Sequence, residues 1–472
     1  MKQKIFAFFK TRHGFYPTLF IISFSAILRY SLAVVNREAN DPHWQVIGII
    51  LDESRLPHAG ETWESFQPKL FHWTMAQGIR LLGLHTGVAQ TVFPQLMNTT
   101  AGMILLFCIV FFLRRLPISE PVRLWSLALI AFNPVFIATS AQGTNDAFVF
   151  LFVALATMTA IEYFRTNRLI FFIVMIIATI LAGLSKGNGL VVLLALMVVW
   201  VLRMIIKGWK EGRFFVLSSF ALLFFWLLTY LLIVPYFGQY IERYEEQGSP
   251  FVTNLMADPL PSLFASSESG RPGVISFSES YLSFPILSLL QTPMITSQTI
   301  DIAPAHRVSL WAQLYGSANF AHFLQWPESW QSTTPFIIDI GRCIMVLGLF
   351  PTIAGALWFI IFWIRNLLDL LLRGRFEEES WVHILVLMGY LAFVCFYAWE
   401  YRDFSTMKAI FIFPALISII FFISGGLEAC FGRLQGAAMH ILMQVGLGVL
   451  VVLYIIDIGD LILQLARVNK YL

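Results

Sequence analysis

The sequence contains little charge and few cysteines. Only 12% of its 472 residues are Asp, Glu, Lys or Arg, whereas 58% are hydrophobic and 15% are aromatic. Soluble domains carry about 25% charged residues, so this composition excludes a water-soluble globule and a disordered chain. The four cysteines have neither the spacing of a zinc site nor that of a disulfide framework. The formal net charge of +3 is too small to indicate a nucleic-acid partner.

Long apolar runs indicate the fold class. A bilayer core about 30 Å thick needs roughly 20 apolar residues in each helix that crosses it. About eleven such runs occur, and they predict an all-α polytopic membrane protein with a single integral membrane domain over residues 1–472. The runs cover residues 16–35, 96–113, 124–141, 147–163, 169–184, 190–206, 214–234, 336–364, 381–399, 409–424 and 437–456.

Basic residues between the runs predict the orientation. Cytoplasmic loops of membrane proteins carry an excess of Lys and Arg. Every second loop of this sequence is basic, beginning with an N-terminal segment that contains Lys2, Lys4, Lys10 and Arg12. The N-terminus is therefore predicted to be cytoplasmic. The expected location is the bacterial inner (plasma) membrane, or the ER membrane in a eukaryote.

The same alternation places two long segments outside, residues 36–94 and 235–335. In the first, apolar residues at helical spacing predict an amphipathic helix at the membrane interface over residues 42–54, and a second is predicted to begin near Pro68. The second segment is rich in Ser and Pro and is interpreted as a lid or a small subdomain. Loops of this length in compact folds usually serve a function.

Three basic residues lie on the outer side, where few are expected. Lys186 follows the fifth run, and Arg402 and Lys408 lie between the ninth and the tenth. Charges at the membrane edge are costly and usually have a partner or a function. Gathered at one leaflet, the three would form a site for a lipid phosphate. The alternative is that each extends to lipid headgroups or pairs with a nearby acid. These acids are Asp146, Glu400 and Asp403.

Acids and histidines of the first outer segment have structural interpretations beside functional ones. Asp41 precedes Pro42, a combination typical of the N-cap and first residue of a helix. A carboxylate held rigidly at the membrane surface is also suited to act as a base. Glu64 and Asp52 are equally explained as solvated loop carboxylates. The histidines lack metal-ligand spacing and are predicted to be surface or interface residues; they are His43, His58 and His72.

Short motifs carry a resemblance to a known family. Asp41 opens the first outer segment, and residues 66–72 (Phe-Gln-Pro-Lys-Leu-Phe-His) resemble that family's His-Pro-Pro-Leu-Tyr stretch. Residues 184–189 (Leu-Ser-Lys-Gly-Asn-Gly) and 407–414 (Met-Lys-Ala-Ile-Phe-Ile-Phe-Pro) follow, and residues 311–316 are a weaker match. In this order they resemble the class C glycosyltransferases (GT-C) that use polyprenyl-phosphate sugars. That group includes the protein O-mannosyltransferases and the lipid A aminoarabinose transferases.

The resemblance implies a reaction and roles for particular residues. A sugar would move, with inversion, from a polyprenyl-phosphate donor to a protein, lipid or glycan acceptor at the extracytoplasmic face. Asp41 would be the general base, and positive charge would meet the departing phosphate. No cofactor is expected, and no metal, because no Asp-x-Asp or clustered His/carboxylate set occurs outside. The implied phosphate ligands are Lys186, Arg402, Lys408 and Lys69, and the implied acceptor or sugar contacts are Glu64, Gln67, His72 and Asp146.

The sequence departs from the family at two points. Many members have Glu directly after the loop Asp, where this chain has Pro42, and Gln67 and Lys69 replace the usual His and second Pro. These changes concern the acceptor class more than the reaction.

Other classes of membrane protein stay open. A secondary transporter or lipid flippase would explain the spans and the charges, but not two outer segments of this length. An O-antigen polymerase or ligase also acts on lipid-linked glycans outside the cytoplasm. A structural scaffold gives no reason for the outer cations. Membrane lipids are expected partners in any case. The sequence does not identify the sugar.

Overall fold

The protein is built entirely from helices in the part of the chain that is described. The computed structural model describes residues 12–37, 42–250, 277–295, 305–323, 328–330, 332–401, 407–433 and 437–470. All elements within these ranges are α-helices or short 3-10 helices, which confirms the all-α polytopic class. Asp41 and Arg402, both singled out from the sequence, lie outside the described residues.

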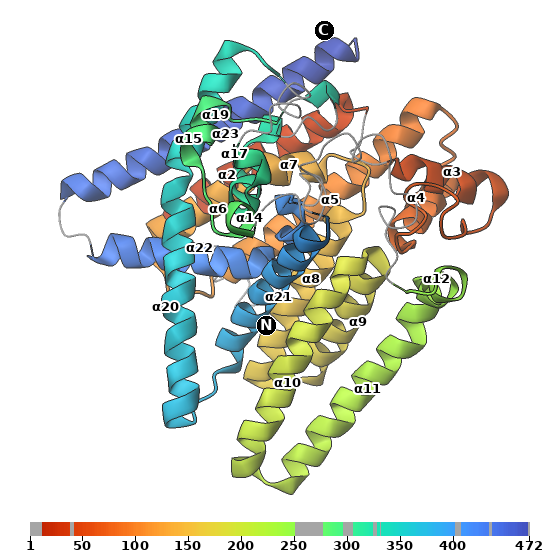
Figure 1. The fold of residues 1–472 in the computed structure, drawn as a ribbon, viewed down its shortest axis with the longest axis vertical. Helices are drawn as coiled ribbons and strands as arrows, with labels where there is room; N and C mark the ends of the chain where they lie inside the picture. Colours follow the sequence, from red (N-terminus) through yellow and green to blue (C-terminus); the bar gives the residue numbers. More distant parts are fainter. Residues whose placement is uncertain are drawn as a thin grey trace.

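The first half of the chain supplies most of the helix hairpins (Figure 1). Helices α8 and α9 pack along each other, as do α10 and α11. The helices are α2 (Arg12–Val35), α3 (His43–Glu53), α4 (Leu70–Leu81), α5 (Gly87–Leu113), α6 (Glu120–Ala131), α7 (Pro134–Ser140), α8 (Asp146–Thr166), α9 (Leu169–Ser185), α10 (Leu190–Glu211) and α11 (Arg213–Phe237).

The second half begins with short helices and ends with long ones. Helix α22 crosses α20, and α23 packs on α2 and α19 (Figure 1). The helices are α12 (Tyr240–Gln247), α14 (Phe277–Tyr281), α15 (Ile286–Gln291), α17 (Ala305–Val308), α18 (Leu310–Asn319), α19 (Pro335–Leu347), α20 (Leu349–Arg373), α21 (Glu378–Tyr401), α22 (Leu416–Arg433) and α23 (Ala437–Val468). The 3-10 turns are η1 (Gly187–Gly189), η3 (Ala321–Phe323), η4 (Glu328–Trp330), η5 (Ala409–Phe411) and η6 (Phe413–Ala415).

Each of the eleven apolar runs coincides with helical structure. Among the described residues, nine helical segments are long and apolar enough to cross a membrane, and a bent pair would make ten. The bent pair is α6 and α7, and α9 is an apolar helix somewhat shorter than the others. The chain is therefore a multi-pass membrane protein, and the number eleven stays a prediction.

The third run is broken at Asn133, where α6 and α7 meet at an angle of 49°. The Asn133 side chain accepts a hydrogen bond from the Phe136 backbone N–H at 2.8 Å, and Pro134 is the first residue of α7. Carbonyl groups freed by the break need donors. The fully buried Arg29 of α2 supplies them, donating to the carbonyl oxygens of Phe136 (3.1 Å) and Ala131 (3.4 Å).

The two helices predicted in the first outer segment are present as α3 and α4, and their position at a membrane interface stays a prediction. Their apolar faces pack together around Val46, Ile50 and Met75, all of which are buried. Helix α3 begins at His43, one residue later than predicted. Its N-cap position is occupied by Pro42, with no side-chain cap. Asp41, which was predicted to cap this helix, lies outside the described residues, so the cap stays a prediction.

Candidate functional site

A buried ion pair joins the start of α8 to the residue after the end of α9. Lys186 Nζ lies 2.6 Å from Asp146 Oδ1, and the side chains are only 11% and 6% exposed. Asp146 also accepts a hydrogen bond from Thr144 Oγ1 at 3.2 Å. The Asn145 amide donates to the Ser185 carbonyl oxygen at 3.0 Å, which fixes the two turns against each other. The pairing considered from the sequence for Lys186 is thus the arrangement found.

Lys408 begins a stretch that packs near this pair. Its side chain is buried, and among the described residues its ammonium has no hydrogen bond or ion pair. It lines a small pocket of about 40 Å³ together with Gln142 and Trp330. Three residues further on, the Phe411 ring centroid lies 5.5 Å from Lys186 Nζ. The stretch from Lys408 to Phe411 therefore connects the small pocket to the surroundings of Lys186.

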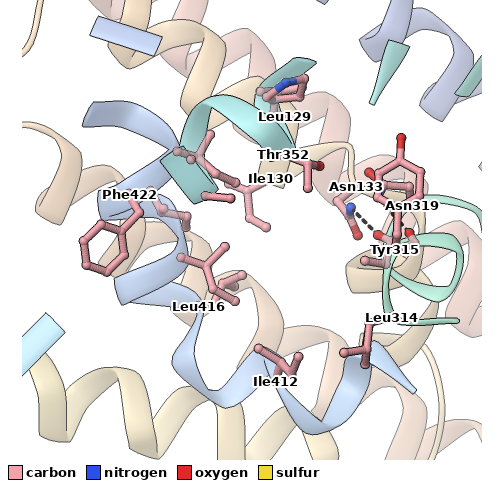
Figure 2. A pocket seen from close by; sticks show the side chains of 18 of the residues that line it. Leu129, Ile130, Asn133, Leu314, Tyr315, Asn319, Thr352, Ile412, Leu416 and Phe422 are labelled. Carbon is pink, nitrogen blue, oxygen red and sulfur yellow. Dashed lines mark hydrogen bonds between the residues drawn. The ribbon is translucent and has the colours of Figure 1, made fainter. Parts of the chain in front are cut away.

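A larger apolar cavity of about 570 Å³ is lined by residues that follow Lys408, among them Ala409 and Ile412. Figure 2 shows it from close by, with Asn133, Tyr315 and Asn319 at one edge. The side-chain amides of Asn133 and Asn319 donate hydrogen bonds to carbonyl oxygens of α18, so these N–H groups already have partners. The remaining wall is almost wholly apolar and includes Leu129, Ile130, Leu314, Ile412, Leu416 and Phe422.

A second polar cluster is buried in the first outer segment. His43 Nδ1 and His72 Nε2 lie 2.8 Å apart, and His43 Nε2 is 3.7 Å from the Glu64 carboxylate. The Lys69 ammonium donates to the carbonyl oxygens of Ser65 and, at 2.8 Å, of Gln67. Burial and the positive charge of a neighbouring arginine lower the pKa of Lys69 to about 7. Burial likewise holds the pKa of His72 well below its usual value.

This burial corrects several expectations. His43 and His72 are 2% and 0% exposed, so the prediction of surface or interface positions is wrong for both. Glu64 and Lys69 are also buried. The Lys69 ammonium already donates to two carbonyl oxygens, and His72 lies against His43. Direct contact of Lys69, His72 or Glu64 with a phosphate, a sugar or an acceptor therefore stays a prediction. Gln67 is half-buried, so its predicted contact with a sugar or an acceptor stays compatible with its position.

The cluster is connected to the ion pair through aromatic packing. The Phe71 ring lies 5.4 Å from that of Phe148, in the first turn of α8 beside Asp146. Arg243 of α12, which the sequence analysis missed, is buried and donates to the Phe66 carbonyl oxygen at 2.7 Å. No local sequence pattern links residues this far apart.

The described residues on either side of Asp41 are both held by hydrogen bonds. Before it, the Asn36 amide donates to the Ala141 carbonyl oxygen at 3.1 Å and accepts a hydrogen bond from Trp330 Nε1 at 3.1 Å. Trp330 lines the pocket that contains Lys408. After it, His43 belongs to the buried cluster described above.

Comparison with known proteins supports the fold. The oligosaccharyltransferase of Archaeoglobus fulgidus, in its apo form, superposes with a TM-score of 0.50 at 13% identity, over 96% of this chain and 56% of that one. The chain has a GT-C-like fold. ArnT from Cupriavidus metallidurans, bound to undecaprenyl phosphate, gives a TM-score of 0.47 at 12% identity, over 88% of this chain and 60% of that one.

The GT-C-like chain is shorter than these proteins. The archaeal oligosaccharyltransferase AglB in complex with an inhibitory peptide and a dolichol-phosphate matches with a TM-score of 0.48 and 12% identity, over 94% of this chain and 56% of that one. The chain thus spans less than two thirds of the length of the solved structures it resembles. No family model and no curated protein matches the sequence.

Proposed function

We propose that this protein is a membrane glycosyltransferase that moves a sugar from a polyprenyl-phosphate donor to an acceptor at the extracytoplasmic face. The GT-C-like fold supports the reaction class, and the sequence motifs support the donor. The cytoplasmic N-terminus, the two long outer segments and a protein, lipid or glycan acceptor belong to the same proposal. So does a bacterial inner membrane, or an ER membrane in a eukaryote.

The observation that carries the proposal is the position of Lys408. A buried ammonium without a counter-ion is costly, and a phosphate would remove that cost. The residues that follow it line the apolar cavity of about 570 Å³. A lipid whose phosphate meets Lys408 could therefore place part of its isoprenoid chain in that cavity. We assign Lys408 as the principal phosphate ligand.

Lys186 has a lesser role in this proposal. Asp146 already neutralises its charge at 2.6 Å, so a donor phosphate would have to compete with that carboxylate. Asp146 is then better described as a positioning residue than as a sugar contact. Arg402 is kept as a further phosphate ligand on the strength of its sequence position alone.

Asp41 is proposed as the general base. An acceptor hydroxyl oxygen attacks the anomeric carbon, the bond from that carbon to the phosphate oxygen breaks, and the hydroxyl proton passes to the Asp41 carboxylate. The negative charge remains on the polyprenyl phosphate, where Lys408 stabilises it. A single displacement inverts the configuration. Glu64, Lys69 and His72 act through neighbours, by holding the segment that follows Asp41.

The test is a binding measurement that does not require the sugar to be known. Purified wild type and Lys408→Gln are titrated with undecaprenyl phosphate and with undecaprenol, which lacks the phosphate. We expect Lys408→Gln to weaken binding of the phosphate lipid at least about tenfold, in line with a lost charge-assisted contact, and to leave undecaprenol binding unchanged.

A matched control is Lys207→Gln, because Lys207 pairs with Glu378 on another part of the molecule. It should bind both lipids like wild type. Equal affinity of wild type and Lys408→Gln for undecaprenyl phosphate would refute the assignment of the phosphate site.

A further inference from the structure

Three metal-ligating side chains from distant parts of the sequence converge beside α12. His58 belongs to the first outer segment, and Glu242 and Glu246 lie one turn apart on α12. His58 Nδ1 lies 2.8 Å from Glu242 Oε1 and 3.7 Å from Glu246 Oε1. One donor atom from each residue lies within 4.8 Å of the others. We propose that His58, Glu242 and Glu246 bind a divalent transition-metal ion of the Zn²⁺ type.

The charge balance of the cluster favours a cation. One imidazole nitrogen faces two carboxylates, and a single N–H cannot form a good hydrogen bond with both. Like charges four residues apart on a helix repel each other, so Glu242 and Glu246 would be better accommodated with a shared counter-ion. Lys69 and Arg243 act on Glu242 from a longer distance, whereas among the described residues the Glu246 carboxylate has an ion pair with His58 alone.

The spacing of the donor atoms also suits one ion. Zinc binds imidazole nitrogen at about 2.0–2.1 Å and carboxylate oxygen at about 2.0–2.2 Å. Two such ligands at a tetrahedral angle lie roughly 3.4 Å apart. The two distances measured from His58 Nδ1, 2.8 and 3.7 Å, bracket that value. Small side-chain rotations would complete the site, with water in the remaining position.

Neighbouring groups orient the ligands. Gln239 Nε2 donates to Glu242 Oε2 at 2.8 Å, which leaves Oε1 directed at His58. The His58 backbone N–H donates a hydrogen bond to the Glu61 carboxylate at 2.9 Å. The Arg55 guanidinium donates two more to the same carboxylate, at 2.8 and 2.5 Å. Such outer partners hold metal ligands in their binding orientation.

The ligand set selects the class of ion. One imidazole nitrogen and two carboxylate oxygens suit zinc and similar transition metals, whereas Mg²⁺ and Ca²⁺ prefer oxygen alone. The ion would fasten the first outer segment to α12. Arg243 of the same helix donates a hydrogen bond to the Phe66 carbonyl oxygen. A metal ion bound to α12 would therefore also stabilise the nearby stretch that contains Lys69. This proposal replaces the expectation of no metal and is independent of the proposed transferase activity.

The test uses the full-length protein, freed of metal by a chelator and titrated with Zn²⁺ alone by calorimetry. We expect one equivalent to bind, at least about tenfold more weakly in Glu246→Gln and in His58→Asn. The matched control is Glu245→Gln, because Glu245 is exposed on the same helix but lies outside the cluster. It should bind Zn²⁺ like wild type, and Mg²⁺ should bind wild type at least tenfold more weakly than Zn²⁺.

Thermal unfolding in chelator checks that each variant is folded. Should one of the two cluster variants fail to fold, the other decides the outcome. Equal Zn²⁺ affinity of wild type and a folded cluster variant would overturn the proposal. An equal loss in Glu245→Gln would do so too, because the binding would then reflect general acidity of α12.

Discussion

Removing one partner of the Lys186–Asp146 pair should destabilise the protein strongly. At 2.6 Å, with side chains 11% and 6% exposed, the two charges are shielded from water. Breaking a buried pair from one side leaves an uncompensated charge and typically costs about 3–5 kcal/mol. We therefore expect Asp146→Asn and Lys186→Met each to lower the unfolding free energy by about that amount. The double variant should lie within roughly 2 kcal/mol of wild type, because it leaves no net buried charge.

The assay is unfolding of the four proteins in the same detergent, followed by heat or denaturant. A control is Asp369→Asn, which removes a surface pair with Arg373, whose side chain is 64% exposed. This substitution should lower the unfolding free energy by at most about 1 kcal/mol. Single variants as stable as wild type, or a double variant whose loss equals the sum of the two single losses, would refute the reasoning.

The same variants report on function. If Lys186 contributes to donor binding, Asp146→Asn removes the carboxylate that competes with the phosphate for Lys186. The affinity for undecaprenyl phosphate should then rise. If Lys408 alone holds the phosphate, that affinity should stay unchanged in folded Asp146→Asn. The stability result and the binding result are therefore separate.

Three further predictions follow from the packing. Arg29→Met removes the charge-assisted hydrogen bonds to the Phe136 and Ala131 carbonyl oxygens, each of which keeps a serine hydroxyl as a donor. It should lower the unfolding free energy by about 1.5–3 kcal/mol in total; stability within 0.5 kcal/mol of wild type in denaturant unfolding would contradict this. The pKa of Lys69 falls to about 7 on folding, so the unfolded chain binds an extra proton above that pH, and wild-type stability should rise from about pH 7 toward 10. When thermal stability is measured as a function of pH, this rise should be absent from Lys69→Met. Identical stability profiles of wild type and Lys69→Met would contradict the assignment of the rise to Lys69. Ala356→Phe narrows the apolar cavity and should weaken the binding of both undecaprenyl phosphate and undecaprenol at least about tenfold. The control Leu357→Phe changes a neighbour that is 55% exposed and should bind both lipids like wild type. Unaltered binding of both lipids to Ala356→Phe would exclude the cavity as the site of the isoprenoid chain.

The sequence was sufficient for the parts of the fold that depend on local hydrophobicity. The helices of the eleven apolar runs, and helices α3 and α4, were predictable because each depends on the composition or periodicity of one segment. The break at Asn133 was not, although Asn-Pro is a helix-start signal, because the apolar run continues through it.

The site was predictable in its residue types more than in its contacts. Lys186, Asp146 and Lys408 stood out as polar residues in apolar surroundings, and the structure pairs the first two and places the stretch after Lys408 near them. The burial of His43 against His72 was missed, because it depends on how α3 and α4 pack. His58 and Glu242 are separated by 184 positions, so no spacing rule could have joined them. The apolar cavity has walls from several helices and no sequence signature of its own.

The central claim is tested most directly by turnover. Purified protein is incubated with a panel of polyprenyl-phosphate sugars and an extract of candidate acceptors, and released polyprenyl phosphate is quantified for wild type and Asp41→Asn. The account predicts release from at least one donor by wild type and a loss of at least about a hundredfold in the folded variant. Equal release by the two proteins, or no release from any donor by a wild type that binds undecaprenyl phosphate, would contradict it.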